Sequence, residues 1–200
     1  MSEMRSIQKK NNLFPVFLKL EQLRVLLIGG GNVALEKLQA IVNNAPATRL
    51  CIVTKEMNPD FARFVARFTQ AEVHIAEYNP SFLDCCDIVI AAVNDLELSK
   101  KIQADAKQRQ KLINVADKPS LCDFYLGSIV TKGNLKLAIS TNGKSPTIAK
   151  RLKEVFNDML PDELDDVLDN LEKIRKDLNG DFKNKVLELN KLTQVLVKKS

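Results

Sequence analysis

The chain has 200 residues, 45% of which are hydrophobic, and it contains only 7 glycines and 7 prolines. A chain of this length and composition can bury a core in one domain with an appendage, which excludes disorder along its whole length. No run of about 18 apolar residues is present to span a bilayer, and residues 1–12 are polar and lack the apolar core of a signal peptide. We therefore expect a soluble, cytoplasmic protein with no membrane partner.

The net charge of +5 suits anionic partners, which include nucleotide phosphates, substrate carboxylates and nucleic acid. Lys and Arg are scattered along the chain and no nucleic-acid-binding motif is visible, so we expect no nucleic-acid partner. The single histidine, His74, and the four cysteines, Cys51, Cys85, Cys86 and Cys122, do not have the spacing of metal ligands. We expect reduced thiols and no bound metal.

The first predicted elements form one strand, helix and strand unit. Residues 24–28 are a short apolar run, typical of a buried parallel strand, and three glycines follow at once. Apolar residues at helical spacing then predict a helix that ends at residues 43–46, and residues 49–53 are a second predicted strand. The whole unit spans about thirty residues, which is the setting that a dinucleotide-binding motif requires.

The same alternation continues as far as residue 116. Asn58 and Pro59 are expected to begin a helix as its N-cap and first residue. Further strands are predicted at residues 73–76, 88–93 and 112–116, with a helix near residues 96–110. Five strands and three helices in this order predict an α/β fold with a doubly wound parallel sheet.

After residue 117 the pattern changes. Residues 128–130 and 135–140 look like two strands joined by the turn Lys132-Gly133-Asn134, which predicts a hairpin and not another strand–helix repeat. Ser145 and Pro146 are expected to begin a helix. The apolar face predicted for this helix consists of Ile148, Leu152, Val155 and Phe156.

Two amphipathic helices are predicted in the tail. Their apolar stripes are Leu164, Val167, Leu171, Ile174 and Leu178 in the first helix, and Phe182, Val186, Leu189 and Leu192 in the second, with Asn179-Gly180 between them. Residues 161–180 carry seven acidic and three basic side chains, whereas residues 181–200 carry two acidic and five basic ones. These opposite charges favour antiparallel pairing of the helices, and the alternative is that most of the charges are simply solvated.

The strongest chemical motif is Gly29-x-Gly31-x-x-Ala34, between the first strand and the first helix. The first glycine permits a tight turn, the second lets a pyrophosphate approach the backbone, and Ala34 allows close helix packing. The phosphate would lie at a helix N-terminus, where free N–H groups and the helix dipole favour negative charge. The motif and its position predict a dinucleotide site.

The residues that recognise the adenosine ribose are expected at the end of the second strand, where Thr54, Lys55 and Glu56 stand. Glu56 can accept hydrogen bonds from a ribose diol, which favours NAD, whereas Lys55 can neutralise a 2′-phosphate and admit NADP. We favour NAD.

A second glycine motif, Gly143-Lys144-Ser145, resembles the end of a phosphate-binding P-loop. Ala138 stands where the first glycine of that motif belongs, within a predicted strand, which argues against an ATPase. The start of the following helix can still hold an acidic group of a substrate.

Four segments in order carry a family resemblance: FPVFLKLEQLRVLLIGGGNVALEKL, AAVNDLELSKKI, NVADKPSLCDF and SIVTKGNLKLAISTNGKSPTIAKRL. They resemble the precorrin-2 dehydrogenase/sirohydrochlorin ferrochelatase family, which forms the N-terminal module of siroheme synthase. The resemblance covers about residues 13–160. No methyltransferase domain follows, so we expect the stand-alone form.

The resemblance implies NAD-dependent oxidation of the tetrapyrrole precorrin-2 to sirohydrochlorin, followed in some members by insertion of ferrous iron to give siroheme. Iron would be a substrate and not a resident metal. A homodimer is also implied, because in the family the segment after the Rossmann domain pairs with its counterpart in the other subunit. The expected organisation is a Rossmann-like NAD-binding domain at residues 1–116, a small β-containing dimerisation segment at 117–145 and an all-helical C-terminal domain at 146–200.

The resemblance also implies site residues. The expected cofactor contacts are Gly29, Gly31, Asn32, Val33, Ala34, Lys55, Glu56, Asn94 and Asp95. Ser140, Thr141 and Lys144 are the expected substrate contacts, although the family commonly has a glycine where this chain has Asn142.

Asp117 is the expected catalytic residue, because it matches the aspartate of the family motif NVxD and follows a strand's carboxyl end. Its carboxylate could take the proton released as hydride leaves, or accept pyrrole protons as iron enters. The alternative for Asp117 is a helix-cap or turn aspartate. For the whole chain the alternatives are a non-catalytic NAD-sensing module that acts through a partner, and a basic binding protein.

Overall fold

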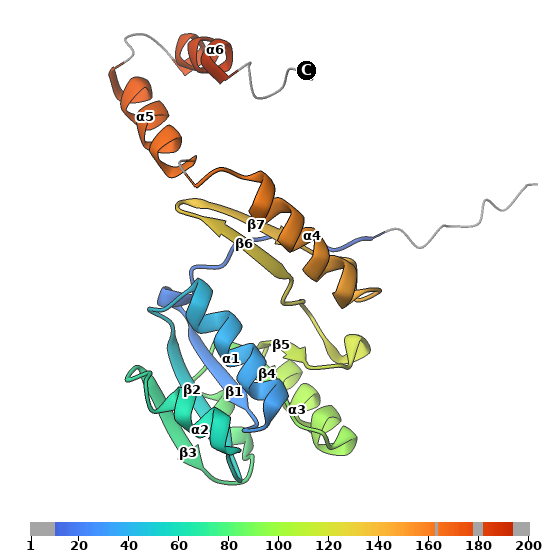
Figure 1. Cartoon of the computed structure of the whole chain (residues 1–200). Helices are drawn as coiled ribbons and strands as arrows, with labels where there is room; N and C mark the ends of the chain where they lie inside the picture. Colours follow the sequence, from blue (N-terminus) through green and yellow to red (C-terminus); the bar gives the residue numbers. More distant parts are fainter. Residues whose placement is uncertain (1–10, 163, 178–181, 194–200) are drawn as a thin grey trace, which may run out of the picture. The chain divides into compact units, whose positions relative to one another are not determined.

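The computed structural model describes residues 11–162, 164–177 and 182–193 (Figure 1). Its elements fall into two compact units. The first contains the chain up to Gly127 together with Ser140–Ser145, and the second contains Ser128–Ile139 and the chain from Pro146 onward. The end predicted for the first tail helix at Asn179-Gly180 lies outside the described residues, as does Leu178.

The first unit contains a parallel five-stranded sheet, in the order β3-β2-β1-β4-β5. Its strands are β1 (Arg24–Ile28), β2 (Arg49–Thr54), β3 (Ala71–Ile75), β4 (Ile88–Ala91) and β5 (Leu112–Val115). Its α-helices are α1 (Asn32–Asn44), α2 (Pro59–Val65) and α3 (Leu96–Gln108). The predicted doubly wound parallel sheet is therefore confirmed.

Both faces of this sheet are covered by helices, which buries side chains on either side of every inner strand. Leu27 of β1 packs with Leu38 of α1 and Phe61 of α2 on one face. Leu26 packs with Ile102 of α3 on the other face. Because neighbouring residues of β1 point to opposite faces and both are buried, the strand has the continuous apolar sequence that predicted it.

Some boundaries differ from the prediction. β4 ends at Ala91 and not at residue 93, because Ala91 is paired with Ile28, the last residue of β1, and no strand continues beyond it. Three short 3₁₀ segments were not predicted, since a single turn has no apolar periodicity. They are η1 (Leu20–Gln22), η2 (Pro80–Leu83) and η3 (Pro119–Leu121).

The second unit contains the predicted hairpin, formed by β6 (Ser128–Lys132) and β7 (Leu135–Ile139), and the helix α4 (Pro146–Met159). Gly133 turns the hairpin with φ +53°. The backbone N–H of Asn134 donates to Asp165 Oδ1 at 2.7 Å, which ties the turn to the chain after α4.

The apolar face predicted for α4 is mostly exposed. Ile148 is 54% exposed, Val155 is 56% exposed, and Met159, one helical turn beyond Val155, is 63% exposed. Ala149 is the buried residue of this helix. In the second unit α4 packs on β6 and β7, and these apolar side chains stay largely exposed.

Two further helices, α5 (Leu164–Asp177) and α6 (Phe182–Thr193), are present where the tail helices were predicted. Lys185 Nζ donates to the carbonyl oxygen of Arg175 at 3.4 Å and links the two helices. Their antiparallel pairing stays a prediction.

Candidate dinucleotide site at the carboxyl edge of the sheet

The predicted cofactor residues follow the carboxyl ends of three neighbouring strands. The glycine turn follows β1, Lys55 and Glu56 follow β2, and Asn94 and Asp95 follow β4. The strand order reverses between β1 and β4, and ligands of open α/β sheets bind at the carboxyl edge beside such a point. The topology thus brings the three groups to one edge of the sheet.

The glycine turn is closely packed at its first two residues. Gly29 has φ +127°, and a Cβ atom there would lie 2.3 Å from the carbonyl oxygen of Ala92. A Cβ atom on Gly30 would lie 2.3 Å from the carbonyl oxygen of Glu56. The motif left Gly30 without a role, and the structure shows that this residue brings the turn against the loop after β2.

Gly31 differs from its neighbours because a Cβ atom added to it would have nothing within 4 Å. It is the N-cap of α1, and no side chain caps the helix there. The caps of α2 and α3 contrast with this, because Asn58 and Asp95 each accept backbone N–H groups of their own helix. The open space and the uncapped N–H groups of α1 fit a pyrophosphate beside Asn32 and Val33.

Ala34 occupies the third position of the motif and is fully buried against the sheet. Its small side chain lets α1 approach β1 closely, which is the role expected of this position. The motif therefore has the local geometry of a dinucleotide-binding turn at each of its three defined positions.

The loop after β2 presents Lys55 and Glu56, both exposed, at the edge where a ribose is expected. The hydroxyl of Thr54 donates to the carbonyl oxygen of Glu56 at 2.6 Å and fixes the loop backbone. Lys55 Nζ lies 2.9 Å from Oε1 of Glu77, just beyond β3. This hydrogen-bonded ion pair raises the pKa of Lys55 and lowers the pKa of Glu77. Glu77 was not predicted, since partners across neighbouring strands are set by the sheet order.

Asn94 and Asp95 are exposed after β4. Oδ1 of Asp95 accepts the backbone N–H groups of Glu97 at 2.8 Å and Leu98 at 3.1 Å. Asp95 therefore has a structural role as the N-cap of α3. Its predicted contact with the cofactor stays a prediction.

Asp117 follows β5 at the same edge and is exposed, with φ +59°. The N-cap of η3 is Lys118, so Asp117 does not cap that helix. It is a turn residue, because the N–H of Lys118 closes a turn onto the carbonyl oxygen of Val115. Within the part of the chain that the structure describes, its carboxylate accepts no hydrogen bond, and it is available to a ligand.

The turn that carries Asp117 is held by Cys122, a residue that the sequence did not single out. Cys122 Sγ accepts the N–H of Val115 at 3.2 Å and lies 3.2 Å from the carbonyl oxygen of the same residue and 3.4 Å from that of Lys118. Burial raises the pKa of this thiol, which keeps it protonated as a donor. Lys118 Nζ donates to the carbonyl oxygen of Val93 at 3.3 Å, which joins the turn to the loop after β4.

The loop of the predicted substrate contacts belongs to the same compact unit as Asp117. A Cβ atom on Gly143 would lie 3.8 Å from Cγ of Pro119, so the loop approaches the turn after Asp117. The Thr141 hydroxyl accepts the N–H of Ser145 at 3.1 Å, and Ser140 Oγ accepts the N–H of Asn142 at 3.2 Å. Both hydroxyls thus have local roles in the loop.

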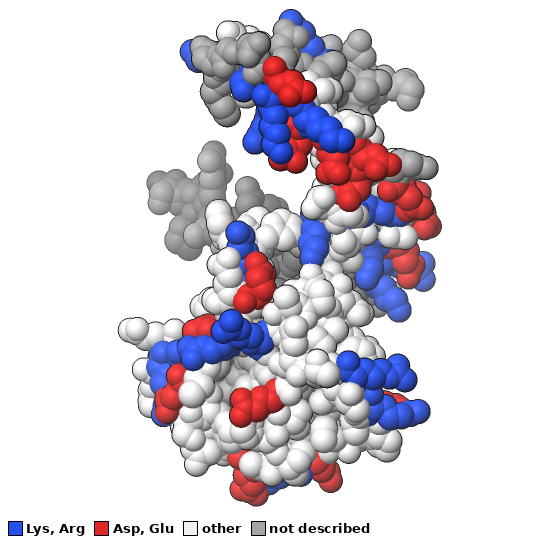
Figure 2. Space-filling view, turned by 90° about the vertical axis from the view of Figure 1, so that its left-hand side faces the viewer, with Lys and Arg blue, Asp and Glu red and all other residues white. Residues whose placement is uncertain are grey.

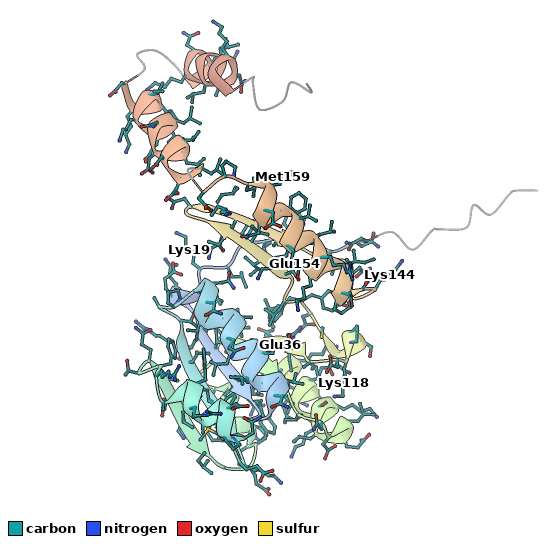
Figure 3. The ribbon with its side chains drawn as sticks, viewed as in Figure 1. Lys19, Glu36, Lys118, Lys144, Glu154 and Met159 are labelled. Carbon is teal, nitrogen blue, oxygen red and sulfur yellow. The ribbon has the colours of Figure 1, made fainter. Side chains whose placement is uncertain are left out.

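Three residues in this loop and in the strand before it bear on what the sequence predicted. Asn142 has φ +55°, which explains a glycine preference at this position, and asparagine is one of the few other residues that adopt it readily. Lys144 is exposed two residues before the start of α4, where it can meet an acidic group (Figure 3). Ala138 lies within β7, so the P-loop alternative lacks both its first glycine and its loop.

Charge is distributed without a dominant basic surface on the face shown in Figure 2, where Lys and Arg are interspersed with Asp and Glu. Among the described residues, no group of three or more His, Cys, Asp or Glu side chains is arranged to hold a metal ion. The helices that the structure describes include none with the length and apolar character needed to cross a membrane.

The chain is similar to two known protein families. The family described as "Putative NAD(P)-binding" matches residues 16–128, and the family described as "Sirohaem biosynthesis protein central" matches residues 132–157. Siroheme synthase 2 of Aeromonas hydrophila is 37% identical over 151 residues, which are 75% of this chain and 31% of that relative. A siroheme synthase of Psychrobacter arcticus is 32% identical over 175 residues, 88% of this chain and 31% of that relative. The chain spans about a third of the length of these curated relatives.

A solved structure named "SirC, precorrin-2 dehydrogenase" matches with a TM-score of 0.68 at 23% sequence identity. The match covers 90% of this chain and 89% of that chain, which establishes a shared fold. The NAD(P)-binding match includes the glycine turn and Asp117. The chain therefore belongs to the putative NAD(P)-binding family and is a relative of siroheme synthases, as its motifs predicted.

Proposed function

We propose that this protein is an NAD-dependent dehydrogenase that oxidises precorrin-2 to sirohydrochlorin. The observation that carries the proposal is the presence, at one edge of the sheet, of an uncapped glycine turn and an exposed carboxylate without a partner in the described chain. The siroheme synthase relatives supply the substrate class. The basic chain suits a substrate with many carboxylates.

NAD, when bound, accepts the hydride that the tetrapyrrole loses. The residues of this chain would hold it through the backbone N–H groups at the start of α1, with Gly31 leaving room for the pyrophosphate. Glu56 and the loop after β2 would contact the adenosine ribose, and Asn94 would contact the cofactor from the loop after β4.

Oxidation of precorrin-2 removes a hydride and a proton, and the proton needs an acceptor. Asp117 supports this role because its carboxylate is exposed at the ligand edge and its position is fixed by a turn hydrogen-bonded to Cys122. The carboxylate would accept the proton as the C–H bond gives its electron pair to NAD. Ser140, Thr141 and Lys144 would contact the substrate from the neighbouring loop.

The test is an anaerobic assay of the protein with precorrin-2 and NAD, which follows NADH formation and the tetrapyrrole spectrum. Asp117→Asn is the sharper variant, because asparagine also tolerates the positive φ of this turn and only the charge is lost. Asp117→Ala removes the side chain and adds backbone strain of about 1 kcal/mol. We expect turnover to fall at least about a hundredfold in both variants, within the usual range for loss of a general base, with NAD affinity unchanged.

Binding of NAD without oxidation of precorrin-2 by the unmodified protein would contradict the enzyme and support the NAD-sensing alternative. Salt-dependent binding of nucleic acid with no affinity for NAD would support the basic binding protein. Full activity of Asp117→Asn would leave the dehydrogenase in place and remove Asp117 as the proton acceptor.

Ferrous iron insertion is the second activity that the resemblance implies. Iron is a substrate here, and its entry into sirohydrochlorin displaces two pyrrole protons, for which Asp117 is again the exposed acceptor. Adding ferrous iron after the oxidation step tests this activity by the appearance of the siroheme spectrum. A spectrum that stays that of sirohydrochlorin would limit the protein to dehydrogenation.

A homodimer is part of the proposal. Ile148, Leu152, Val155 and Met159 recur at helical spacing on one exposed face of α4. Over these residues the stripe is roughly 16 Å long at 1.5 Å per residue, and a second copy of the chain would cover it. Val155→Asp should shift the mass measured by light scattering from dimer to monomer, and Lys153→Asp, also exposed on α4, is its control.

A further inference from the structure

We propose that Glu77 is a specificity-determining residue that favours NAD over NADP, because it holds Lys55, the cation that a 2′-phosphate would need. The inference rests on the proposed binding of a dinucleotide at the carboxyl edge of the sheet. It assigns a function to an ion pair that the sequence did not reveal.

The pair lies where the ribose is expected. Lys55 is the first residue after β2, and Glu77 is the second residue after β3. The two strands are parallel neighbours, and the N–H of Ala76 donates to the carbonyl oxygen of Thr54 at 2.9 Å just before the pair. The register of the sheet therefore brings the backbones of Lys55 and Glu77 near each other, and Lys55 Nζ lies 2.9 Å from Glu77 Oε1.

The surroundings of Lys55 are acidic overall. Glu56 follows it in the chain, Glu77 pairs with it, and Asp95, the N-cap of α3, also raises its pKa through charge. The charges of two carboxylates, Glu77 and Asp95, thus act on this one cation. Glu56 is the carboxylate proposed to accept hydrogen bonds from the NAD ribose, whereas all of these carboxylates repel the two negative charges of a 2′-phosphate.

The expected effect of the ion pair on NADP binding is small, because both of its side chains are exposed. The Lys55 side chain is 65% exposed and that of Glu77 is 79% exposed, so water and salt screen the pair. Exposed ion pairs of this kind are weak, because two hydrated charges gain little from pairing. Releasing Lys55 should therefore improve NADP binding by about twofold to fivefold.

The experiment measures dissociation constants of NAD and NADP by calorimetry on the full chain, at low and at high salt. Glu77→Gln keeps the shape of the side chain and removes its charge. Glu72→Gln is the matched control, since Glu72 is an equally exposed glutamate of β3 that pairs with His74 and does not contact Lys55. Lys55→Gln, alone and combined with Glu77→Gln, completes the set.

We expect Glu77→Gln to tighten NADP binding by about twofold to fivefold, with little change for NAD, and Glu72→Gln to resemble the unmodified protein. The gain should shrink at high salt and disappear when Lys55 is also replaced. An unchanged NAD to NADP ratio in Glu77→Gln would overturn this inference while leaving dinucleotide binding intact. Failure of the unmodified protein to bind either dinucleotide would instead overturn the proposed function.

Discussion

The two compact units differ in how they bury their apolar side chains. In the first unit both faces of the sheet are covered by the chain's own helices, and Leu26 and Leu27 are fully buried on opposite faces. In the second unit the described residues bury mainly Val130 and Ala149, while Val155 and Met159 are exposed. A parallel sheet with crossover helices completes its own core, whereas a hairpin with one helix leaves an apolar face uncovered.

The two units also differ in their proposed roles. The first unit carries the glycine turn, Asp117 and the loop of Ser140–Ser145, so the proposed chemistry depends on a self-sufficient fold. The second unit carries the exposed stripe proposed for dimerisation. Substitutions that separate folding from association should therefore act differently in the two units.

The largest expected effect on stability comes from a matched pair of leucines. Leu26→Ala empties a fully buried site and should lower the free energy of unfolding by about 3 kcal/mol. Leu152, which is 38% exposed, should lose less than about 1 kcal/mol on the same change and should instead weaken the dimer. The first effect is measured by urea unfolding, provided that the slope of unfolding free energy against urea concentration is the same in both proteins. The second is measured by light scattering across a dilution series. Equal destabilisation by both changes would contradict the difference between the units.

A second pair of substitutions, at two glycines of the first unit, distinguishes an effect on stability from an effect on NAD binding. Gly29→Ala places a methyl group against the carbonyl oxygen of Ala92 at a positive φ, and should cost about 2 kcal/mol or more in stability. Gly31→Ala meets open space and should leave stability unchanged, while it weakens NAD binding roughly tenfold by keeping the pyrophosphate from the backbone. Thermal unfolding with and without NAD checks both. A Gly31→Ala protein that binds NAD normally would contradict the placement of the phosphate.

A smaller effect is expected at the turn that carries Asp117. Cys122→Ala removes the group that bonds Val115 and Lys118, and should lower stability by about 1 kcal/mol. Cys122→Ser keeps a donor and an acceptor and should lose less. Urea unfolding ranks the two variants, and equal losses would mean that packing and not hydrogen bonding holds the turn.

The local elements could be predicted from the sequence to a large extent. The apolar run at residues 24–28, the cap at Asn58 and the turn at Gly133 each depend on neighbours along the chain, and each is present in the structure. Family motifs supplied Asp117, which local periodicity alone would have left as a turn residue.

The unpredicted features depend on contacts between distant parts of the chain. Glu77 meets Lys55 only because β2 and β3 are neighbours, and Gly30 is constrained only because Glu56 lies against it. Cys122 reaches Val115 through a turn of the backbone that no periodicity encodes. The stripe on α4 was predicted, but its exposure could not be, because exposure depends on which distant elements pack on the helix.

The smallest expected effect concerns one ion pair from each unit. Asp87 accepts bonds from the side chain and backbone of Arg24, which lowers its pKa below the ordinary value of 3.8, and the pairing with Lys132 likewise lowers the pKa of Asp162. A carboxylate whose pKa is lower in the folded state stabilises the fold at a pH above its unfolded pKa. This contribution is lost as the pH falls through its folded pKa.

Allowing for solvent screening, Asp87→Asn should lower the free energy of unfolding by about 0.5 kcal/mol or less near neutral pH. The stability of this variant should fall less steeply than that of the unmodified protein below pH 3.8. Asp162 is the more exposed carboxylate, at 89% against 34% for Asp87, so Asp162→Asn should change the acid profile less. Midpoints of urea unfolding, measured from neutral to acid pH, test which substitution changes the pH dependence more. The same pH dependence in all three proteins would show that neither ion pair is linked to folding.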